Sequence, residues 1–274
     1  MLVEITEAGL LPDTRRNLEA IREFVISKSL VTIPSPVRAQ VKETLPPFRA
    51  TSFASMDTPG PFETKATEAY YYVTPTEPGW PDAQKQEWLT AFNYYTTDVV
   101  SIHEAYPGHH LQLHVANSHP SVTRMLTDAP EFVEGWGMYS EQMMREQGFD
   151  DGPMFRLTMH TDAIWRAVRI ILDVRMHRGE IGVDDAARFM IEQTSFEEAN
   201  ARAEVNRYTY TPTYQLSYLL GKVLLLQLRR DEQRRLGDRF SLRRFHDTLL
   251  DNGSLPISFH RRLLRAEGLL PDPT

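Results

Sequence analysis

Residues 103–110 read His-Glu-Ala-Tyr-Pro-Gly-His-His, and this stretch decides how the rest of the chain is interpreted. Two histidines one turn apart on a helix, with a glutamate beside the first, form the familiar H-E-x-x-H zinc site. His103 and Glu104 fit that pattern, but Pro107 occupies the position of the second histidine. The strict pattern therefore fails, and the two histidines that end the stretch are the next candidates.

A break in the helix would still allow two of these histidines to meet one ion. On an ideal helix seven residues return to nearly the same face but climb roughly 10 Å, at about 1.5 Å per residue. Pro107 and Gly108 are residues at which helices kink or bulge. A local bulge of two residues would bring His109 to the place of the second ligand beside His103. His110 is the competing choice, and the sequence leaves both open.

A third ligand is expected from residues 132–141, which read Phe-Val-Glu-Gly-Trp-Gly-Met-Tyr-Ser-Glu. The chain has no cysteine, so a metal site must use His, Asp and Glu. Glu134 is flanked by apolar side chains and follows His109 by 25 residues, which is room for a helix to turn back antiparallel. Glu141 lies seven residues further on the same helical face and would either support a ligand or pair with an arginine.

Composition excludes several classes of protein. The chain has 274 residues and a net charge of −7, and the arginine-rich residues 229–235 alternate in sign, which indicates a solvated helix face and no nucleic-acid partner. No apolar run approaches the roughly 20 residues of a membrane span. Residues 1–30 carry charges that are atypical of a signal peptide. We therefore expect a cytoplasmic protein, with export of a longer form as the alternative.

The chain changes character near residue 83. Residues 1–82 hold 10 of the 18 prolines and predict one helix over 16–28 and strands over 48–53 and 68–74. Residues 83–274 predict helices over 83–106, 109–118, 131–147, 153–178, 183–193, 213–236 and 242–250. The expected fold is mainly α, of the α+β class, with a small β-sheet near the N-terminus. The two regions are expected to form one continuous domain.

Several motifs of the chain occur together in one bacterial family. Residues 103–112 look like the HExxPGHxxQ signature of the bacterial family named domain of unknown function 885 (DUF885). Residues 134–141 match its EGWxxYxE pattern, and residues 204–212 resemble its ExxRYxxxP pattern. The chain also resembles the closing segment of the family, with the matching residues in the expected order: Gly221, residues 245–247 and residues 253–256. The resemblance runs across nearly the whole chain.

This resemblance implies a gluzincin-like zinc fold, a helical peptidase domain in which two histidines and a downstream glutamate bind zinc. The ligands would then be His103, His109 and Glu134. The angiotensin-converting-enzyme, thimet-oligopeptidase and Taq-carboxypeptidase groups are similar in plan. Members of the family are usually about twice as long, and this chain resembles their C-terminal half. A separate N-terminal half or a second copy in a homodimer is expected to complete the substrate cleft.

The implied activity is hydrolysis of a peptide or small amide by a zinc-activated water, with Glu104 as general base. The oxyanion that forms needs a hydrogen-bond donor, and the tyrosines to consider first are Tyr208 and Tyr214. Arg207 would bind a substrate carboxylate through its forked guanidinium group. His246 is a further catalytic candidate.

Other interpretations stay open. Asp173 and His177, one helical turn apart, would either orient a metal ligand or form a local pair. The same site would also serve a zinc hydrolase of a non-peptide amide or ester. A truncated product that binds metal without turnover is the third possibility. A di-iron helical bundle is disfavoured because its paired Glu-x-x-His signatures are absent from the sequence.

Overall fold

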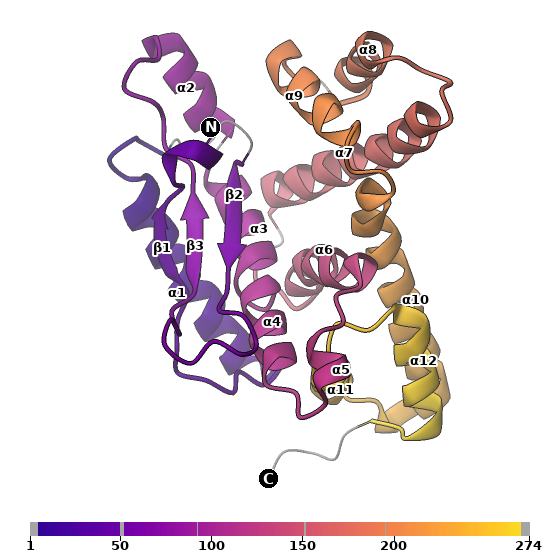
Figure 1. The fold of residues 1–274 in the computed structure, drawn as a ribbon. Coiled ribbons are helices and arrows are strands. Elements are labelled where there is room, and N and C mark those ends of the chain that lie inside the picture. The colour runs from indigo at the N-terminus through magenta and orange to yellow at the C-terminus, as the bar shows by residue number, and fades with distance from the viewer. Residues whose placement is uncertain (1–4, 50–51, 92, 151, 195, 270–274) are drawn as a thin grey trace.

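The computed structural model describes residues 5–49, 52–91, 93–150, 152–194 and 196–269. These residues form a mainly helical structure with a small sheet near the N-terminus, as predicted (Figure 1). The first part of the chain contains α1 (Leu10–Ser27), β1 (Gln40–Glu43), the 3-10 helix η1 (Pro46–Phe48), β2 (Ala54–Asp57), β3 (Tyr70–Val73) and α2 (Asp82–Ala91). The middle part contains α3 (Tyr94–Glu104), α4 (His109–Asn117), α5 (Val122–Met125), α6 (Pro130–Glu146) and α7 (Pro153–His177). The last part contains α8 (Val183–Thr194), α9 (Glu198–Tyr208), η2 (Tyr214–Leu216), α10 (Ser217–Leu236), η3 (Gly237–Arg239), α11 (Leu242–Asp251) and α12 (Ile257–Ala266).

The sheet has three strands, with β3 in the centre. β1 runs parallel to β3 and places Gln40 opposite Tyr70, whereas β2 runs antiparallel and places Ala54 opposite Val73. Tyr71 and Val73 of β3 are buried, as expected when alternate side chains of a strand face the core. β2 is an edge strand, and it packs against α3 and α4. The sheet therefore lies directly beside the helices that carry the His-Glu stretch.

One strand prediction for the N-terminal region is wrong, and one strand is not predicted. The predicted strand over 48–53 is wrong, because Pro46–Phe48 forms a 3-10 helix and the strand follows at Ala54–Asp57. Consecutive prolines fix φ and remove backbone donors, which favours the turn. Residues 50–51 lie outside the described residues. The sequence does not predict β1, because only Val41 of its four residues is buried and the pattern is too short.

Most helices lie where the periodicity predicts them, with three differences. The first is α1, which begins at Leu10, six residues before its predicted start, and the short helix α5 is not predicted. The helix predicted over 83–106 is two helices, because the side chain of Asn93 accepts a hydrogen bond from the Thr96 N–H and starts α3 anew. The helix predicted over 213–236 begins with the 3-10 turn η2 before α10. The sequence does not predict α9 and α12. Within the described part of the chain, no helix combines the length and apolar character needed to cross a membrane.

The centre of the fold is α6, which packs between α3 and α10 (Figure 1). Phe132, Trp136 and Tyr139 of α6 are fully buried in the main core cluster, which also takes in α1 and the sheet. α6 and α10 approach closely at two glycines, where a Cβ on Gly221 would lie 2.7 Å from the Cα of Gly135. This close contact fixes α6 and the acidic side chains it carries.

Candidate metal centre

The backbone between α3 and α4 interrupts the helical path in a way that brings two histidines together. α3 ends at Glu104, and α4 begins at His109. Across the junction the Gly108 N–H donates to the Ile102 carbonyl (3.1 Å), six residues back instead of the four of an α-helix. The chain therefore holds two extra residues at this point, as the spacing predicts, although they separate two helices and do not bulge within one.

Gly108 is required at this junction because the backbone leaves no room for a side chain. A Cβ at this position would lie 1.8 Å from the carbonyl oxygen of His103 and 2.4 Å from that of Ile102. Such distances are far inside van der Waals contact, so any other residue would push α4 away from α3. The glycine thus allows His109 to approach His103, and their ring centroids lie 4.7 Å apart at 90°.

His103, His109 and Glu134 come together as a triad whose ligand atoms all lie within 4.8 Å of one another. The Oε2 atom of Glu134 is 3.4 Å from the Nε2 of His103 and 3.4 Å from the Nε2 of His109. Zinc bonds of about 2.0–2.1 Å at tetrahedral angles would separate two ligand atoms by roughly 3.4 Å. These separations are too long for good hydrogen bonds, and they match the spacing around one ion.

The buried polar atoms of the triad also fit a bound cation. Glu134 is only 7% exposed, and its Oε2 atom is buried without a hydrogen-bond partner. Its other oxygen accepts a hydrogen bond from the Tyr214 hydroxyl (2.5 Å). A buried carboxylate oxygen without a donor is costly in a folded protein, and a metal ion facing it removes that cost. The residues present therefore fit a bound metal ion.

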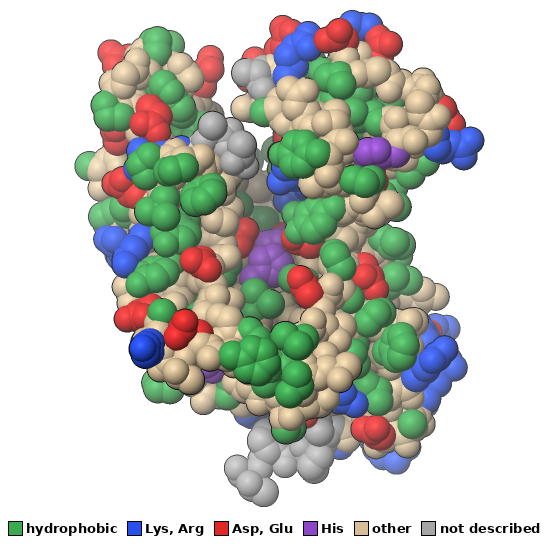
Figure 2. Space-filling view, in the orientation of Figure 1, with side chains coloured by type: hydrophobic (Ala, Val, Ile, Leu, Met, Phe, Trp, Pro, Cys, Tyr) green, Lys and Arg blue, Asp and Glu red, His purple; other side chains and the backbone are tan. Residues whose placement is uncertain are grey.

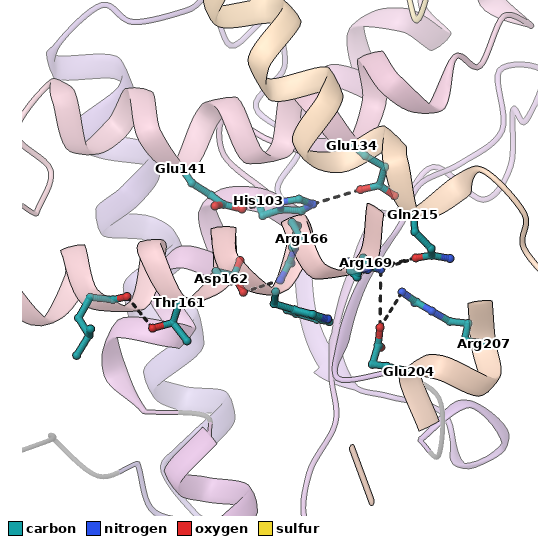
Figure 3. Close-up of polar contacts among 12 residues, drawn as sticks. His103, Glu134, Glu141, Thr161, Asp162, Arg166, Arg169, Glu204, Arg207 and Gln215 are labelled. Atoms are coloured by element: carbon teal, nitrogen blue, oxygen red, sulfur yellow. Dashed lines mark hydrogen bonds and ion pairs between the residues drawn. The ribbon is translucent and has the colours of Figure 1, made fainter. Parts of the chain in front are cut away.

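Glu141 holds the His103 ring in the orientation that a metal ligand needs. Because a carboxylate only accepts hydrogen bonds, the His103 Nδ1–H donates to Glu141 Oε1 (2.7 Å), and Nε2 faces Glu134 (Figure 3). Gly137 lies under the ring, where a Cβ would be 2.6 Å from the ring carbon Cε1. Of the two roles that the sequence suggests for Glu141, the structure favours support of a ligand.

Opposing charges dominate the electrostatics of this buried site. Burial alone would lower the pKa of His103, but the neighbouring carboxylates of Glu134 and Glu141 raise it to about 10. Burial alone would raise the pKa of Glu134, yet His103 and His109 lower it well below its usual range. The carboxylates that stabilise a proton on His103 would stabilise a divalent cation in the same place.

Glu104 lies beside the triad, at the end of α3. Burial raises the pKa of its carboxyl group, while the charges of His109 and His103 lower it in part. A hydrogen bond from the backbone of Met56, on the edge strand β2, also lowers it. In Figure 2 histidine lies at the floor of a hollow between the sheet side and the helical side of the molecule.

His110 faces away from the triad. Its ring packs against Tyr106 and lies 6.3 Å from the ring of His114. His110 and His114 line a small cavity of about 180 Å³ on the side of α4 away from the triad. Burial and the neighbouring His114 lower the pKa of His110 to about 4. Of the two alternatives that the sequence leaves open, the structure places His109 in the triad.

The tyrosine and arginine candidates occupy different places. Tyr214 contacts Glu134 through its hydroxyl, as described above, whereas Tyr208 is fully buried and donates to Glu204 (2.8 Å). Arg207 also reaches Glu204, at 3.4 Å. The structure therefore brings Tyr214 to the triad and places Tyr208 among the helices α7, α8 and α9.

His246, a catalytic candidate from the sequence, lies in the core of the fold. Its Nδ1–H donates to the Leu30 carbonyl (2.7 Å), and its Nε2 accepts from the Tyr139 hydroxyl (2.6 Å). Both nitrogens are thus occupied, and burial lowers its pKa to about 3. The interpretation of His246 as catalytic needs correction, because it is a neutral histidine that ties α11 to the N-terminal segment.

Asp173 and His177 form the local pair that the sequence allows. Their side chains lie 3.3 Å apart on α7, and Asp173 accepts the Thr213 N–H (2.9 Å). His177 in turn contacts the Tyr208 carbonyl (3.0 Å). These contacts fix the segment between α9 and α10. Neither Asp173 nor His177 belongs to the triad.

Sequence reasoning missed Tyr218 and the arginines beside it. The Tyr218 ring stacks near the ring of His103, with centroids 6.3 Å apart. The Cζ atom of Arg169 lies 4.3 Å from the centroid of the Tyr218 ring. Tyr218 follows Tyr214 by four residues, so both face the same way across η2 and α10. That spacing is a signal the sequence contains.

Comparison with known families identifies one match. Residues 3–264 match the family described as bacterial protein of unknown function (DUF885). Among curated proteins, no sequence matches this chain.

Two solved structures are similar along almost the whole chain. One is a candidate lipoprotein of unknown function from Shewanella oneidensis, with 28% sequence identity, a TM-score of 0.84, and coverage of 96% of this chain and 47% of that one. The other is a candidate lipoprotein from Colwellia psychrerythraea, with 27% identity, a TM-score of 0.84, and coverage of 97% of this chain and 44% of that one. The chain thus spans less than half the length of each protein.

The cytoplasmic location predicted from the sequence is contradicted by these matches. Both similar proteins are described as lipoproteins, and lipoproteins are not cytoplasmic. The prediction relied on the first 30 residues of a chain that matches less than half of each relative, so those residues carry no information on an export signal or anchor.

Proposed function

The chain belongs to the bacterial DUF885 family, and from this membership and its buried triad we propose that it is a zinc-dependent metallopeptidase. The observation that carries the proposal is the unpartnered Oε2 atom of Glu134, 3.4 Å from the Nε2 atoms of both His103 and His109. Two histidines and one carboxylate, with a further position open, are the ligand set of catalytic zinc.

Under this proposal one atom of each ligand would bind the metal ion. His103 and His109 bind through Nε2, and Glu134 binds through Oε2, with its Oε1 held by the Tyr214 hydroxyl. A zinc ion bound there supplies a Lewis acid that lowers the pKa of water to about 7 and polarises a carbonyl group.

Glu104 is the general base in this mechanism. Its carboxylate takes a proton from the attacking water and passes it to the nitrogen of the leaving amine. A base works best when its pKa is near the working pH, and burial raises the pKa of Glu104 toward that range. Its position on the last turn of α3, next to His103, places it beside the triad that would hold the metal ion.

Tyr214 is the donor proposed for the developing oxyanion. Its hydroxyl is already at Glu134, and its side chain is 38% exposed, so it lies between the metal centre and solvent. As negative charge builds up, the single proton of this hydroxyl would turn from Glu134 Oε1 to the oxyanion. Tyr208 is unsuited to that role, because it is fully buried among α7, α8 and α9 and does not contact the triad.

A mixture of short peptides tests the activity. We expect the zinc-loaded protein to cleave some of them, as followed by mass spectrometry, and expect a chelator to stop cleavage until zinc is restored. Amide and ester substrates without a peptide bond form a second panel. Turnover of that panel alone would instead favour a zinc hydrolase of non-peptide substrates, and turnover of neither would contradict the proposal.

A fourth contact, from Glu141 to His103, is expected to raise zinc affinity. Glu141→Gln keeps an oxygen that accepts the Nδ1–H but removes the charge that strengthens the imidazole as a ligand. Zinc affinity should fall about 10- to 100-fold, measured by competition with a fluorescent chelator. The control is Glu146→Gln. Glu146 lies on the same helix as Glu141 and pairs with Arg229 of α10, so this change should leave zinc affinity unchanged. Equal affinities in the two variants would show that the Glu141 charge has no role.

A further inference from the structure

Three arginines gather on one side of the candidate metal centre, on the wall formed by α7 and α9 (Figure 3). Arg169 lies over the ring of Tyr218, and Arg166 lies 5.8 Å from that ring. The charge of Arg207 acts on Tyr218 as well. Because Tyr218 stacks near His103, the arginine wall lies one aromatic ring away from the triad. In Figure 2, basic side chains are visible on the wall of the hollow.

The three guanidinium groups of this wall have only two carboxylates as direct partners among the ion pairs of the described residues. Arg166 pairs with Asp162 at 2.5 Å. Arg169 and Arg207 share a single carboxylate, that of Glu204, at 3.9 Å and 3.4 Å. Three guanidinium groups therefore share two directly paired carboxylates, and the charge of Glu134 in the triad acts on Arg169 as well.

Arg207 is the member of the set that a ligand can reach. Its side chain is 30% exposed, compared with 11% for Arg166 and 2% for Arg169. Arg169 donates twice to the amide oxygen of Gln215, and this holds it in place. Arg207 has one long hydrogen bond to Glu204, and its buried Nε has no partner. A partly exposed guanidinium group with unused hydrogen-bond donors can bind an anion.

We propose that Arg207 binds the free C-terminal carboxylate of a peptide substrate, so that bonds near the C-terminus are the ones presented to the triad. The proposal rests on the peptidase function proposed above. The fork of a guanidinium group matches the two oxygens of a carboxylate. Arg169 and Arg207 share one carboxylate, so one further guanidinium group is free to pair with a monoanion, whereas a phosphate group would bring nearly twice the negative charge. The enzyme would then act as a carboxypeptidase, removing one or a few residues from the C-terminus.

The binding test needs no turnover. The probes are N-acetyl-Ala-Ala-Phe and the same peptide with a C-terminal amide, titrated calorimetrically into the full chain. We expect the acid to bind about 10- to 100-fold more tightly than the amide. This is the difference in affinity that one hydrogen bond to a charged group produces. Arg207→Gln should abolish the preference, and Arg207→Lys should keep part of it. Arg202→Gln, which changes an exposed arginine of the same helix that pairs with Asp184, is the matched control and should keep the preference in full.

The outcomes separate this inference from the peptidase proposal. Equal binding and equal cleavage of acid and amide by the wild-type protein would overturn the carboxylate site and leave the peptidase in place. Tight binding of an amide peptide that carries an internal aspartate would overturn it too, in favour of an acidic side-chain site. Preferred binding of the acid without cleavage of any peptide would support the site and contradict the peptidase. The comparison of acid and amide uses the wild-type protein, so it holds even if an Arg207 variant fails to fold.

Discussion

Replacing Glu104 with glutamine is expected to lower kcat for peptide hydrolysis by roughly 10²- to 10⁴-fold, the usual contribution of a general base. An amide of nearly the same shape cannot accept a proton from water, so the attack step loses its base. Glu104 is outside the triad of His103, His109 and Glu134, so the zinc content of the variant should equal that of the wild-type protein. The measurement is kcat on a peptide that the wild-type protein cleaves, with zinc determined on the same samples.

Glu87→Gln provides the control for this variant, because Glu87 is an exposed glutamate on α2. Its activity should match that of the wild type. If Glu104→Gln kept activity within a few-fold of the wild type while carrying its zinc, another group would have to be the base.

Removing a triad member is expected to have the largest effect on metal binding. Zinc bound at a protein site of four ligands has an apparent binding free energy of about 10–16 kcal/mol, so one lost ligand should weaken binding by roughly 10²- to 10³-fold. This applies to His109→Ala and Glu134→Ala alike, measured by competition with a chelator of known affinity. Hydrolysis should fall with the metal.

His110→Ala is the matched control for His109→Ala. His110 is the next residue, it is also a buried histidine, and its ring lies on the opposite side of α4 next to His114. Zinc affinity should be unchanged in this variant. If instead His110→Ala lost zinc and His109→Ala kept it, the ligand assignment at this position would be reversed.

The sequence predicts the triad because ligand chemistry limits the choice of residues. Without cysteine, the Pro-Gly break after His103 and the apolar flanks of Glu134 leave few other candidates. The choice between His109 and His110 depends on the path of the backbone from Glu104 to Gly108. Adjacent residues on a helix point about 100° apart, so the start of α4 decides which ring faces Glu134. Motif spacing does not contain that information.

His246 and Tyr218 show two further limits of sequence reasoning. His246 is a core residue because of partners that are distant in sequence, the Leu30 carbonyl and the Tyr139 hydroxyl, and a single sequence does not reveal them. Tyr218 is close to His103 because α10 packs on α6 at two glycines. Such contacts follow from tertiary packing, whereas periodicity predicts only which face of a helix is apolar.

The strand errors have a local cause. β1 and β2 are four residues long, and Val41 is the one buried residue of the two strands, so the alternation of buried and exposed side chains is weak. β3 has the aromatic run from Tyr70 to Tyr72 and alternate burial, and its prediction is confirmed. Long periodic helices such as α6 and α7 are predicted to within a residue or so at their ends.

The zinc content of the purified full-length chain tests the central claim most directly. Elemental analysis after incubation with zinc and removal of the excess should give about one zinc per chain, retained in His110→Ala and lost in Glu134→Ala. Absence of zinc from the wild-type protein under these conditions would contradict the metal centre and, with it, the proposed peptidase.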